Sequence, residues 1–549
     1  MSAPLSPAHE PYSDMKNFGS FDFIIVGAGS AGCVLANRLT ASGRHSVLLL
    51  EAGPRDLNPW IHIPLGYGKL FKEPSVNWLY STEPEPELNN RRIGQPRGRV
   101  LGGSSSINGL VYVRGQREDF DGWRELGNPG WGWDDVLPHF IRSEDYVRGA
   151  NDYHGAGGPL AVSDQADPHP LCDAFIDAGQ AAGYARNEDF NGAWQEGFGY
   201  YQMTTRNGLR CSTAKGYLRP ARGRSNLAIL TGALATRVVL RERRAVGVEW
   251  RRGNAGWAAD ARAEVILAGG AINTPQLLEL SGVGSAAVLG RYGIPILHEL
   301  PGVGEALQDH LQVRTVFRCS QPITFNDDMR TLWGHARVVM RYIFQRKGPL
   351  TVGAGYAGAF FRTARELARP DVQVHFITFS TTKMGDVLHS FSGFTASVCQ
   401  LRPDSRGSVH ITGRDPARSP AILCNYLAAE RDRRVTVAGM QQVRRIMRAD
   451  PMKPFVAEEV EPGEGCRSDE EVLAFCRERG ASIYHPTCTA RMGTDPMAVV
   501  DARLRVHGIR GLRVADGSVM PTLVSGNSNA AIVMIGEKAS NLILEDHLR

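Results

Sequence analysis

The chain has 549 residues, of which 42% are hydrophobic and 22% charged, and its formal net charge is +5. A chain of this length predicts more than one domain, and its balance of apolar and charged residues is that of a globular protein. Basic and acidic side chains are interspersed rather than gathered in blocks. We therefore expect no nucleic-acid partner.

The nine cysteines are scattered from Cys33 to Cys488 and form no C-x-x-C pair. This pattern favours free thiols in a reducing compartment over a disulfide framework. Residues 1–20 lack the apolar stretch of a signal peptide, and no window of the sequence is long and apolar enough to span a membrane. We expect a flexible lead over 1–20 and a cytoplasmic protein, with peripheral contact at the inner face of a membrane left open.

The first structured segment covers residues 21–54. An apolar run from Phe23 to Val26 predicts a buried strand, which is followed by a glycine turn, a helix through Leu39 and a second buried strand, "SVLLLE". This order is typical of a βαβ unit that opens a doubly wound parallel sheet.

Further predicted strands are spread along the chain. Residues 226–252 predict a meander, 263–270 a buried strand, and 511–521 a last strand that runs into a turn. The section between them has alternating strand patterns such as "DVQVHFITFS". The chain thus predicts a discontinuous nucleotide-binding domain (21–160, 225–310 and 480–549) with an inserted α+β domain on a largely antiparallel sheet (161–224 and 311–479).

Gly27, Gly29 and Gly32 form a G-x-G-x-x-G motif between the first strand and its helix. The glycines allow a tight turn, close approach of a pyrophosphate and close helix packing, while Ser30 and Ala31 open the helix whose N–H groups would bind the phosphates. Glu51, followed by Ala52, ends the second strand, where a carboxylate can accept a hydrogen bond from a ribose hydroxyl. The motif predicts a dinucleotide but does not distinguish NAD from FAD.

A second glycine-rich stretch, "GRVLGGSSSINGLVYVRG" (98–115), lies between apolar residues, so its backbone donors need a partner. This stretch resembles the first signature of the glucose–methanol–choline (GMC) oxidoreductase family. Segments 269–284, 301–310 and 512–540 are similar to the family's later landmarks, in the same order. The resemblance implies a Rossmann-like FAD-binding domain, an inserted substrate-binding domain and the oxidation of alcohols, and is closest to bacterial primary-alcohol and choline dehydrogenases.

The resemblance also implies which residues contact FAD. It assigns the loop from Gly102 to the ribityl chain and pyrophosphate, Val238 to the adenine, and the turn at Asp516 to the pyrophosphate. Some relatives attach FAD covalently through a histidine at the position of Ile107, so we expect noncovalent FAD here. The implied cofactor-binding residues are Gly27, Gly29, Ser30, Ala31, Glu51, Ala52, Trp78, Arg99, Gly102, Gly103, Ser104, Asn108, Gly109, Leu110, Val111, Val238, Asp516, Gly517, Asn527 and Ser528.

His485 in "ASIYHPTCTARMG" (481–493) allows three interpretations. With Cys488 it would form an H-x-x-C pair, but a structural metal normally takes four ligands and no second pair lies nearby, so we expect no metal site. A histidine can also simply pack in a core. The resemblance instead implies that His485 accepts the alcohol proton beside flavin N5, at a pKa close to neutrality. Asn527, which follows "PTLVSG", would orient the substrate oxygen.

The substrate pocket implied by the resemblance contains Tyr356, Ile483 and Tyr484. Choline-oxidising relatives tend to carry a carboxylate near the place of Tyr356, so an uncharged primary alcohol suits this chain better. Choline dehydrogenase and aryl-alcohol oxidase remain alternatives, as does an FAD-containing hydroxynitrile lyase. We expect a quinone-type acceptor or oxygen to take the electrons; the sequence does not determine the acceptor or the oligomeric state.

Overall fold

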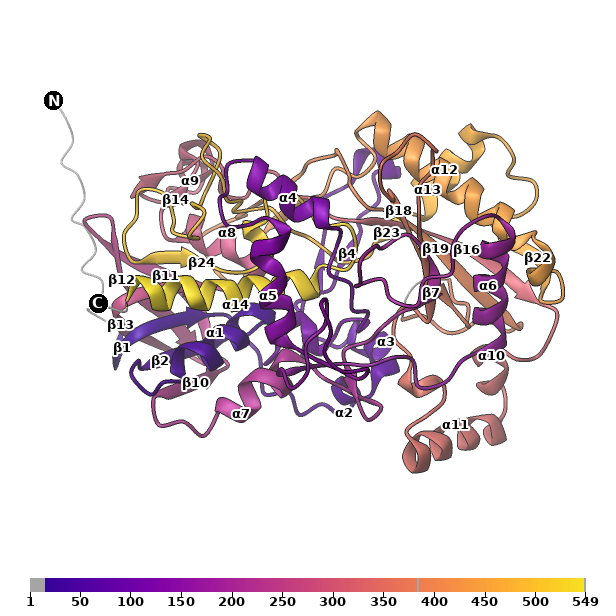
Figure 1. Ribbon diagram of the computed structural model, residues 1–549. Coiled ribbons are helices and arrows are strands. Elements are labelled where there is room, and N and C mark those ends of the chain that lie inside the picture. The colour runs from indigo at the N-terminus through magenta and orange to yellow at the C-terminus, as the bar shows by residue number, and fades with distance from the viewer. Residues whose placement is uncertain (1–14, 383–384, 548–549) are drawn as a thin grey trace.

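The computed structural model describes residues 15–382 and 385–547. Its chain forms two seven-stranded sheets, one built from residues 16–51, 227–267 and 512–514 and the other from residues 197–200 and 311–482. Figure 1 shows the two sheets in neighbouring halves of an elongated molecule, with the C-terminal helix α14 (Asn529–Asp546) crossing the first half.

The first sheet has the order β10-β2-β1-β13-β12-β11, and β24 pairs with β13. Pairing is parallel among β10, β2, β1, β13 and β24 and antiparallel among β11, β12 and β13. The strands are β1 (Lys16–Val26), β2 (Val47–Glu51), β10 (Leu227–Thr231), β11 (Leu234–Arg241), β12 (Arg244–Arg252), β13 (Ala255–Leu267) and β24 (Leu512–Val514).

Two details of this sheet differ from the sequence predictions. β1 begins at Lys16, because residues ahead of Phe23 pair with the long β13. The predicted flexible lead therefore does not include residues 16–20, and its residues 1–14 lie outside the described part of the chain. The predicted meander over 226–252 is wrong, because β10 pairs in parallel with β2 at one edge while β11 and β12 form a hairpin at the other.

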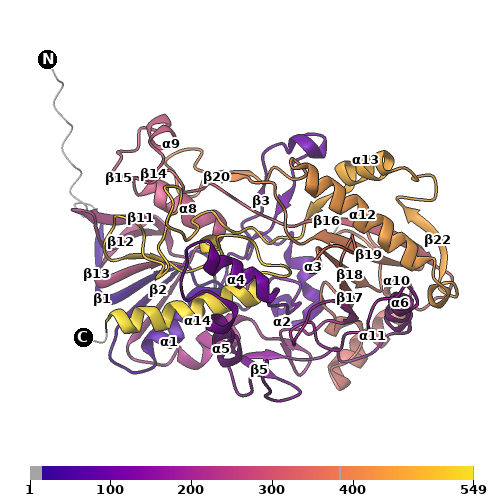
Figure 2. The ribbon, with the colours of Figure 1, turned by 45° about the horizontal axis from the view of Figure 1, so that its top comes forward.

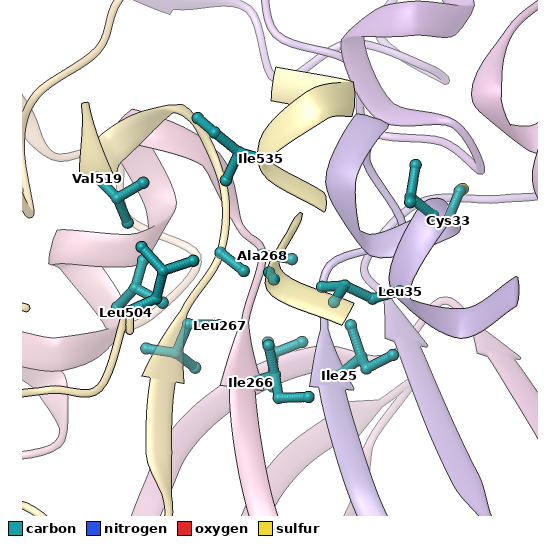
Figure 3. Close-up of a cluster of buried hydrophobic side chains, with 14 of the residues drawn as sticks. Ile25, Cys33, Leu35, Ile266, Leu267, Ala268, Leu504, Val519 and Ile535 are labelled. Atoms are coloured by element: carbon teal, nitrogen blue, oxygen red, sulfur yellow. The ribbon is translucent and has the colours of Figure 1, made fainter. Parts of the chain in front are cut away.

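Helices α1 (Ser30–Thr40) and α14 pack together over the first sheet. Figure 3 shows the core beneath them, where Ile25, Leu35 and Ile266 lie close together and Ile535 lies on the other side of Ala268 in the same buried cluster. The side chains of Leu35 and of the three isoleucines are fully buried. This packing fixes the N-terminal ends of both helices relative to the carboxyl ends of β1 and β13.

The second sheet has the order β22-β16-β19-β18-β17-β7, with β23 beside β16, and all its pairs are antiparallel. Together with the first sheet it confirms the predicted fold class, a doubly wound α/β domain joined to an α+β domain. The predicted boundary at residue 480 falls just before β23. The strands are β7 (Gly197–Tyr200), β16 (Leu311–Cys319), β17 (Ala357–Phe361), β18 (Val372–Ile377), β19 (Gly393–Gln400), β22 (Val456–Glu461) and β23 (Ala481–Ser482).

Helices α6 (Pro170–Ala181) and α12 (Glu430–Met447) pack on the second sheet. Helix α11 (Leu332–Gln345) instead projects from the body of the molecule, as the views in Figures 1 and 2 both show. Within residues 15–382 and 385–547, no helix has the length and apolar character needed to cross a membrane. All nine cysteines are free thiols, as predicted.

Candidate active site

The glycine turn after β1 is built by close backbone contacts. Gly27 has a φ of +102°, and a Cβ there would lie 2.5 Å from the carbonyl oxygen of Ala268. A Cβ on Gly32 would lie 1.9 Å from the carbonyl oxygen of Gly27. Helix α1 starts directly after this turn and receives no capping hydrogen bond from any described side chain. Its first N–H groups therefore remain available to an anion.

Glu51 supports the turn with both carboxylate oxygens. Its Oε2 accepts from the N–H of Ala28 at 3.0 Å, and its Oε1 accepts from the N–H of Gly53 at 2.8 Å. Burial raises the pKa of Glu51 to about 7 against the lowering effect of these two N–H donors. The carboxylate thus has a structural role in addition to the expected ribose contact.

The second glycine-rich loop lies directly against the first. The N–H of Gly102 donates to the carbonyl of Ala28 at 2.8 Å, and a Cβ on Gly103 would lie 2.7 Å from the Cα of Gly29. Further along, the N–H of Ala354 donates to the carbonyl of Gly109 at 2.9 Å. This loop therefore joins the dinucleotide turn to the second domain.

Asp516 holds the C-terminal part of the site together. Its Oδ2 accepts from the N–H of Gly270 at 2.8 Å and from Thr274 Oγ1 at 2.7 Å, while its Oδ1 accepts from the N–H of Ser518 at 2.8 Å. The following helix, α14, begins after Ser528, and no described side chain caps it. Two helix N-termini, those of α1 and α14, are thus open to the same space.

One continuous cavity connects these elements to His485. It runs from the glycine turn, along the second loop and past the start of α14 to the second sheet. Of the residues singled out from the sequence, it is lined by Gly27, Gly29, Ser30, Ala31, Glu51, Ala52, Trp78, Gly103, Ser104, Asn108, Gly109, Leu110, Val111, Ile483, Tyr484, His485, Asp516, Gly517, Asn527 and Ser528.

Three of the expected cofactor-binding residues lie behind the cavity wall. Gly102 joins the two loops, as described above. The Arg99 guanidinium lies over the ring of Trp78, 5.0 Å from its centroid. The N–H of Val238 donates to Ser281 Oγ at 2.9 Å, and Ala233–Ala235 at the start of β11 line the cavity instead. The adenine contact expected at Val238 is therefore reassigned to residues 233–235, at the beginning of the strand.

Tyr356 does not belong to the cavity wall either. Its hydroxyl donates to the carbonyl of Asp167, and its ring packs beside Tyr200 in the core of the second domain. The N–H of Tyr356 pairs with Phe376, so the register of β17 on β18 fixes which side of the sheet the ring occupies. Ala354 lines the cavity there, so Tyr356 does not contact the substrate and does not select its charge.

His485 is held in place by Asp309 and His310, two consecutive residues at the end of the segment "PGVGEALQDH". Asp309 Oδ1 accepts from the backbone N–H of His485 at 2.7 Å. The Nδ1 atoms of His310 and His485 lie 3.0 Å apart. On the other side, His485 Nε2 lies 3.3 Å from Nδ2 of Asn527, whose Oδ1 accepts from Gln373 at 3.0 Å.

This network assigns the position of the ring hydrogens. His310 Nε2 lies 2.8 Å from the carbonyl oxygen of Leu401, which can only accept, so that nitrogen carries the hydrogen. In the neutral His310 ring, Nδ1 is then an acceptor, and His485 Nδ1 must donate to it. His485 Nε2 therefore presents a lone pair toward Asn527 and the cavity.

The electrostatics of the cluster favour the neutral form of His485. Burial, the neighbouring rings of His310 and His375 and the charge of Arg97 hold the pKa of His485 well below its usual 6.5. Burial also lowers the pKa of His310. The pKa is thus lower than the near-neutral value expected from the sequence, so the ring is neutral at neutral pH, which is the form that can accept a proton.

A polar face of the second sheet completes this end of the cavity, and the sequence analysis missed it. His375 and Arg314 both pair with Ser397, so their side chains share one face, and both line the cavity. Neither ring nitrogen of His375 makes a hydrogen bond of standard geometry with a described residue, and burial lowers the pKa of this ring to about 4 against the raising effect of the nearby Asn527 side chain. The only sequence signal was a histidine inside a buried strand pattern.

Two comparisons with known proteins agree with this geometry. Two sequence profiles of the GMC oxidoreductase family match residues 21–312 and 403–536. An alcohol dehydrogenase [acceptor] of Pseudomonas putida is 44% identical over 95% of this chain and 96% of its own length. An oxygen-dependent choline dehydrogenase of Photobacterium profundum is 42% identical over 96% of this chain and 93% of its own length.

The chain belongs to the GMC oxidoreductase family. Among solved structures, pyridoxine 4-oxidase from Mesorbium loti superposes with a TM-score of 0.87 at 31% identity, covering 96% of this chain and 99% of that one. The protein is thus an FAD-dependent enzyme that acts on CH–OH donors, as the sequence predicted.

The cavity fits the FAD that this family uses. It is long, it passes two uncapped helix N-termini, and glycines at its wall stand where a Cβ would collide with neighbouring backbone. Behind the cavity-lining ring of Trp78, the buried Nε of Arg99 has no partner among the described residues. The glycine turn and the start of α1 would hold the phosphates, and the start of α14 would face the redox-active ring.

Proposed function

We propose that the protein oxidises an uncharged primary alcohol to its aldehyde, with His485 as the base and noncovalent FAD as the oxidant. The observation that carries this proposal is the orientation of His485, whose lone pair at Nε2 points into the cavity beside Asn527. Its lowered pKa keeps this nitrogen free of a proton at neutral pH.

His485 and Asn527 have different roles toward the substrate hydroxyl. His485 Nε2 accepts the hydroxyl proton, so that the carbonyl product forms without a proton on oxygen. Asn527 Nδ2 donates to the substrate oxygen and orients it without competing for that proton. Bound FAD supplies the acceptor for the hydride that leaves the alcohol carbon. Gln373 holds the Asn527 amide in this orientation through a hydrogen bond of 3.0 Å.

The charge of the cavity supports an uncharged substrate. Arg97 and Arg314 both line it, and its lining carboxylates in the described chain are Glu51 and Asp516, which belong to the dinucleotide end. The guanidinium of Arg314 has no hydrogen-bond or ion-pair partner among the residues that the structure describes. A trimethylammonium group would therefore meet positive charge rather than a carboxylate.

Three further properties belong to this proposal. Ile107, at the position where some relatives attach FAD, is buried and has no nucleophilic atom, which supports noncovalent binding. The similarity to an alcohol dehydrogenase [acceptor] supports a separate electron acceptor, for which we propose a quinone-type carrier, while the similarity to an oxygen-dependent choline dehydrogenase supports oxygen as the alternative. The nine free thiols support a reducing, cytoplasmic environment.

Anaerobic reduction of the bound flavin tests the proposal. The purified holoenzyme is mixed without oxygen with choline, aliphatic primary alcohols and benzylic alcohols, and the flavin absorbance is followed. We expect bleaching by the uncharged alcohols, far slower bleaching by choline, and slow return of colour in air. Faster bleaching by choline would contradict the substrate class, and rapid return of colour would identify an oxidase. A flavin that no alcohol bleaches would favour the lyase.

The variant Arg314→Gln tests the role of charge. It keeps a polar side chain but removes the positive charge, so we expect the KM for choline to fall while the KM for an uncharged alcohol changes little. An unchanged ratio of the two KM values would show that Arg314 does not control substrate charge.

A further inference from the structure

Helix α11 presents its apolar side to solvent. Six large apolar side chains are exposed on it, and Leu332, Trp333 and Phe344 have 87%, 86% and 73% of their surface accessible. The complete set of exposed large apolar residues on α11 is Leu332, Trp333, Val339, Met340, Ile343 and Phe344. An exposed apolar surface of this kind marks an interaction site.

The spacing of these residues places them on a single face. At 100° per residue they fall within one arc, centred opposite Val338 and Tyr342, which are buried. We call these six residues the apolar face of α11. The opposite face attaches the helix to the protein, through a hydrogen bond of 3.1 Å from the Tyr342 hydroxyl to Gly208 and an ion pair of 2.8 Å between Arg341 and Asp167. The apolar face therefore points outward in a helix that is held in place.

Unpaired positive charge lies at the C-terminal end of this face. Residues 329–350 contain four arginines and one lysine and no aspartate or glutamate. Arg330, Arg337 and Arg341 form ion pairs with Asp327, Asp328 and Asp167. Arg346 and Lys347 at the end of the helix are exposed and form no ion pair with any acidic group in the described chain. A broad apolar face with tryptophan, bordered by basic side chains, is the pattern of a helix that lies in the interface of an anionic bilayer.

The helix is also connected to the active-site cavity. The chain leaves α11 through the short helix η5 (Pro349–Thr351), which contacts α11, and reaches Ala354 at the cavity wall. Ala354 donates its N–H to Gly109 of the loop along which FAD is expected. Only a short stretch of chain therefore separates α11 from the loop along which FAD is expected.

We propose that the apolar face of α11 docks this protein on the surface of an anionic lipid bilayer. The helix would lie in the plane of the membrane, with its apolar face among the acyl chains and Arg346 and Lys347 at the headgroups. Arg346 and Lys347 favour this partner over a second copy of the chain, because a second copy would bring two more unpaired positive charges and no acidic group to pair with them. The inference goes beyond the proposed function, since docking does not depend on which alcohol is oxidised.

Co-sedimentation with vesicles tests the proposal. The full-length holoenzyme is centrifuged with vesicles of phosphatidylglycerol and phosphatidylcholine or of phosphatidylcholine alone. We expect binding to the anionic vesicles, weaker binding to the neutral ones, and release by salt. In the double variant Trp333→Ser, Phe344→Ser, the partition coefficient for anionic vesicles should fall at least about tenfold.

Trp194 provides a matched control, because 70% of its surface is also exposed and it lies outside α11. Trp194→Ser should bind vesicles like the unmodified protein, and all variants should keep their flavin reduction by alcohol in solution. Equal vesicle binding by the double variant would overturn the proposal. So would a dimer, seen by analytical ultracentrifugation without lipid, that the double variant abolishes, because α11 would then be a protein–protein interface.

Discussion

At the scale of single residues, the site depends on how the hydrogens of one histidine are held. The backbone N–H of His485 is bonded to Asp309 and its Nδ1 to His310, so that only Nε2 faces the cavity. Asp309 is itself fixed by Gln95 at 3.1 Å and Ser482 at 2.5 Å. A base whose ring can neither rotate nor change tautomer is positioned before the substrate arrives.

His485→Ala removes the base. We expect anaerobic flavin reduction by a primary alcohol to slow by about 10²–10⁴-fold, the usual contribution of a general base, while the FAD content stays the same. Rapid-mixing absorbance measurements give both quantities. His335→Ala, an exposed histidine outside the cavity, is the control. Equal rates for the two variants would remove His485 from the mechanism.

His310→Phe tests the tautomer argument. Phenylalanine keeps a ring in this buried position but offers no acceptor to His485 Nδ1. We expect flavin reduction to slow by about tenfold, the rate equivalent of one hydrogen bond of about 1.4 kcal/mol, with unchanged FAD content. The KM for the alcohol should stay the same, because His310 does not line the cavity. A higher KM with an unchanged rate would contradict a positioning role.

At the scale of secondary-structure elements, a charged histidine joins strand β20 (Ser408–His410) to helix α8 (Gly270–Leu280). His410 at the end of β20 lies 2.7 Å from Glu279 of α8 and 3.1 Å from Glu305. Burial opposes the charge of His410, but the hydrogen bonds to both carboxylates outweigh burial and raise its pKa to about 9. The ring is therefore a cation at neutral pH.

His410→Gln should lose stability in a pH-dependent way. Because the folded pKa is raised from 6.5 to about 9, the stabilisation is complete below pH 6.5 and is lost as the pH rises through 9. It amounts to about 3 kcal/mol at most. Urea unfolding should show a large difference between variant and wild type at pH 6, and almost none at pH 10. An equal difference in unfolding free energy at the two pH values would show that the charge of His410 does not stabilise the fold.

At the scale of the whole molecule, the cavity lies between the two sheets. Its walls come from the dinucleotide turn, the loop at Gly103–Val111 and the start of α14 on one side, and from β16 and β18 on the other. A ligand that fills it must contact both domains. Binding of such a ligand stabilises the folded state as a unit.

Removal of FAD should therefore destabilise both domains together. With FAD at 100 times its Kd the stabilisation is about 2.7 kcal/mol, so the apoprotein should unfold at a lower temperature, and added FAD should restore it. Calorimetry of apoprotein and holoenzyme tests this. A single transition that moves as a whole is expected; two transitions of which only one moves would place FAD in one domain alone.

The elements that the sequence predicted are those coded by local pattern. The glycine motif, Glu51 and the strands around them follow from the backbone freedom of glycine and from apolar runs, and the structure places them in one turn. The family resemblance identified His485 and Asn527, and the structure brings their side chains to 3.3 Å across a sequence gap of 42 residues. Fold class, FAD and enzyme class could likewise be inferred before the structure.

Tertiary structure alone decided which side chains face the cavity. The register of β17 on β18 turned Tyr356 away from the cavity, and the shared pairing of Arg314 and His375 with Ser397 brought those two side chains to it. A one-residue change of register would reverse both outcomes, and nothing local in the sequence fixes a register between distant strands. The sequence likewise does not say whether the apolar residues of α11 face a core or solvent, and only the burial of Val338 and Tyr342 shows that they face outward.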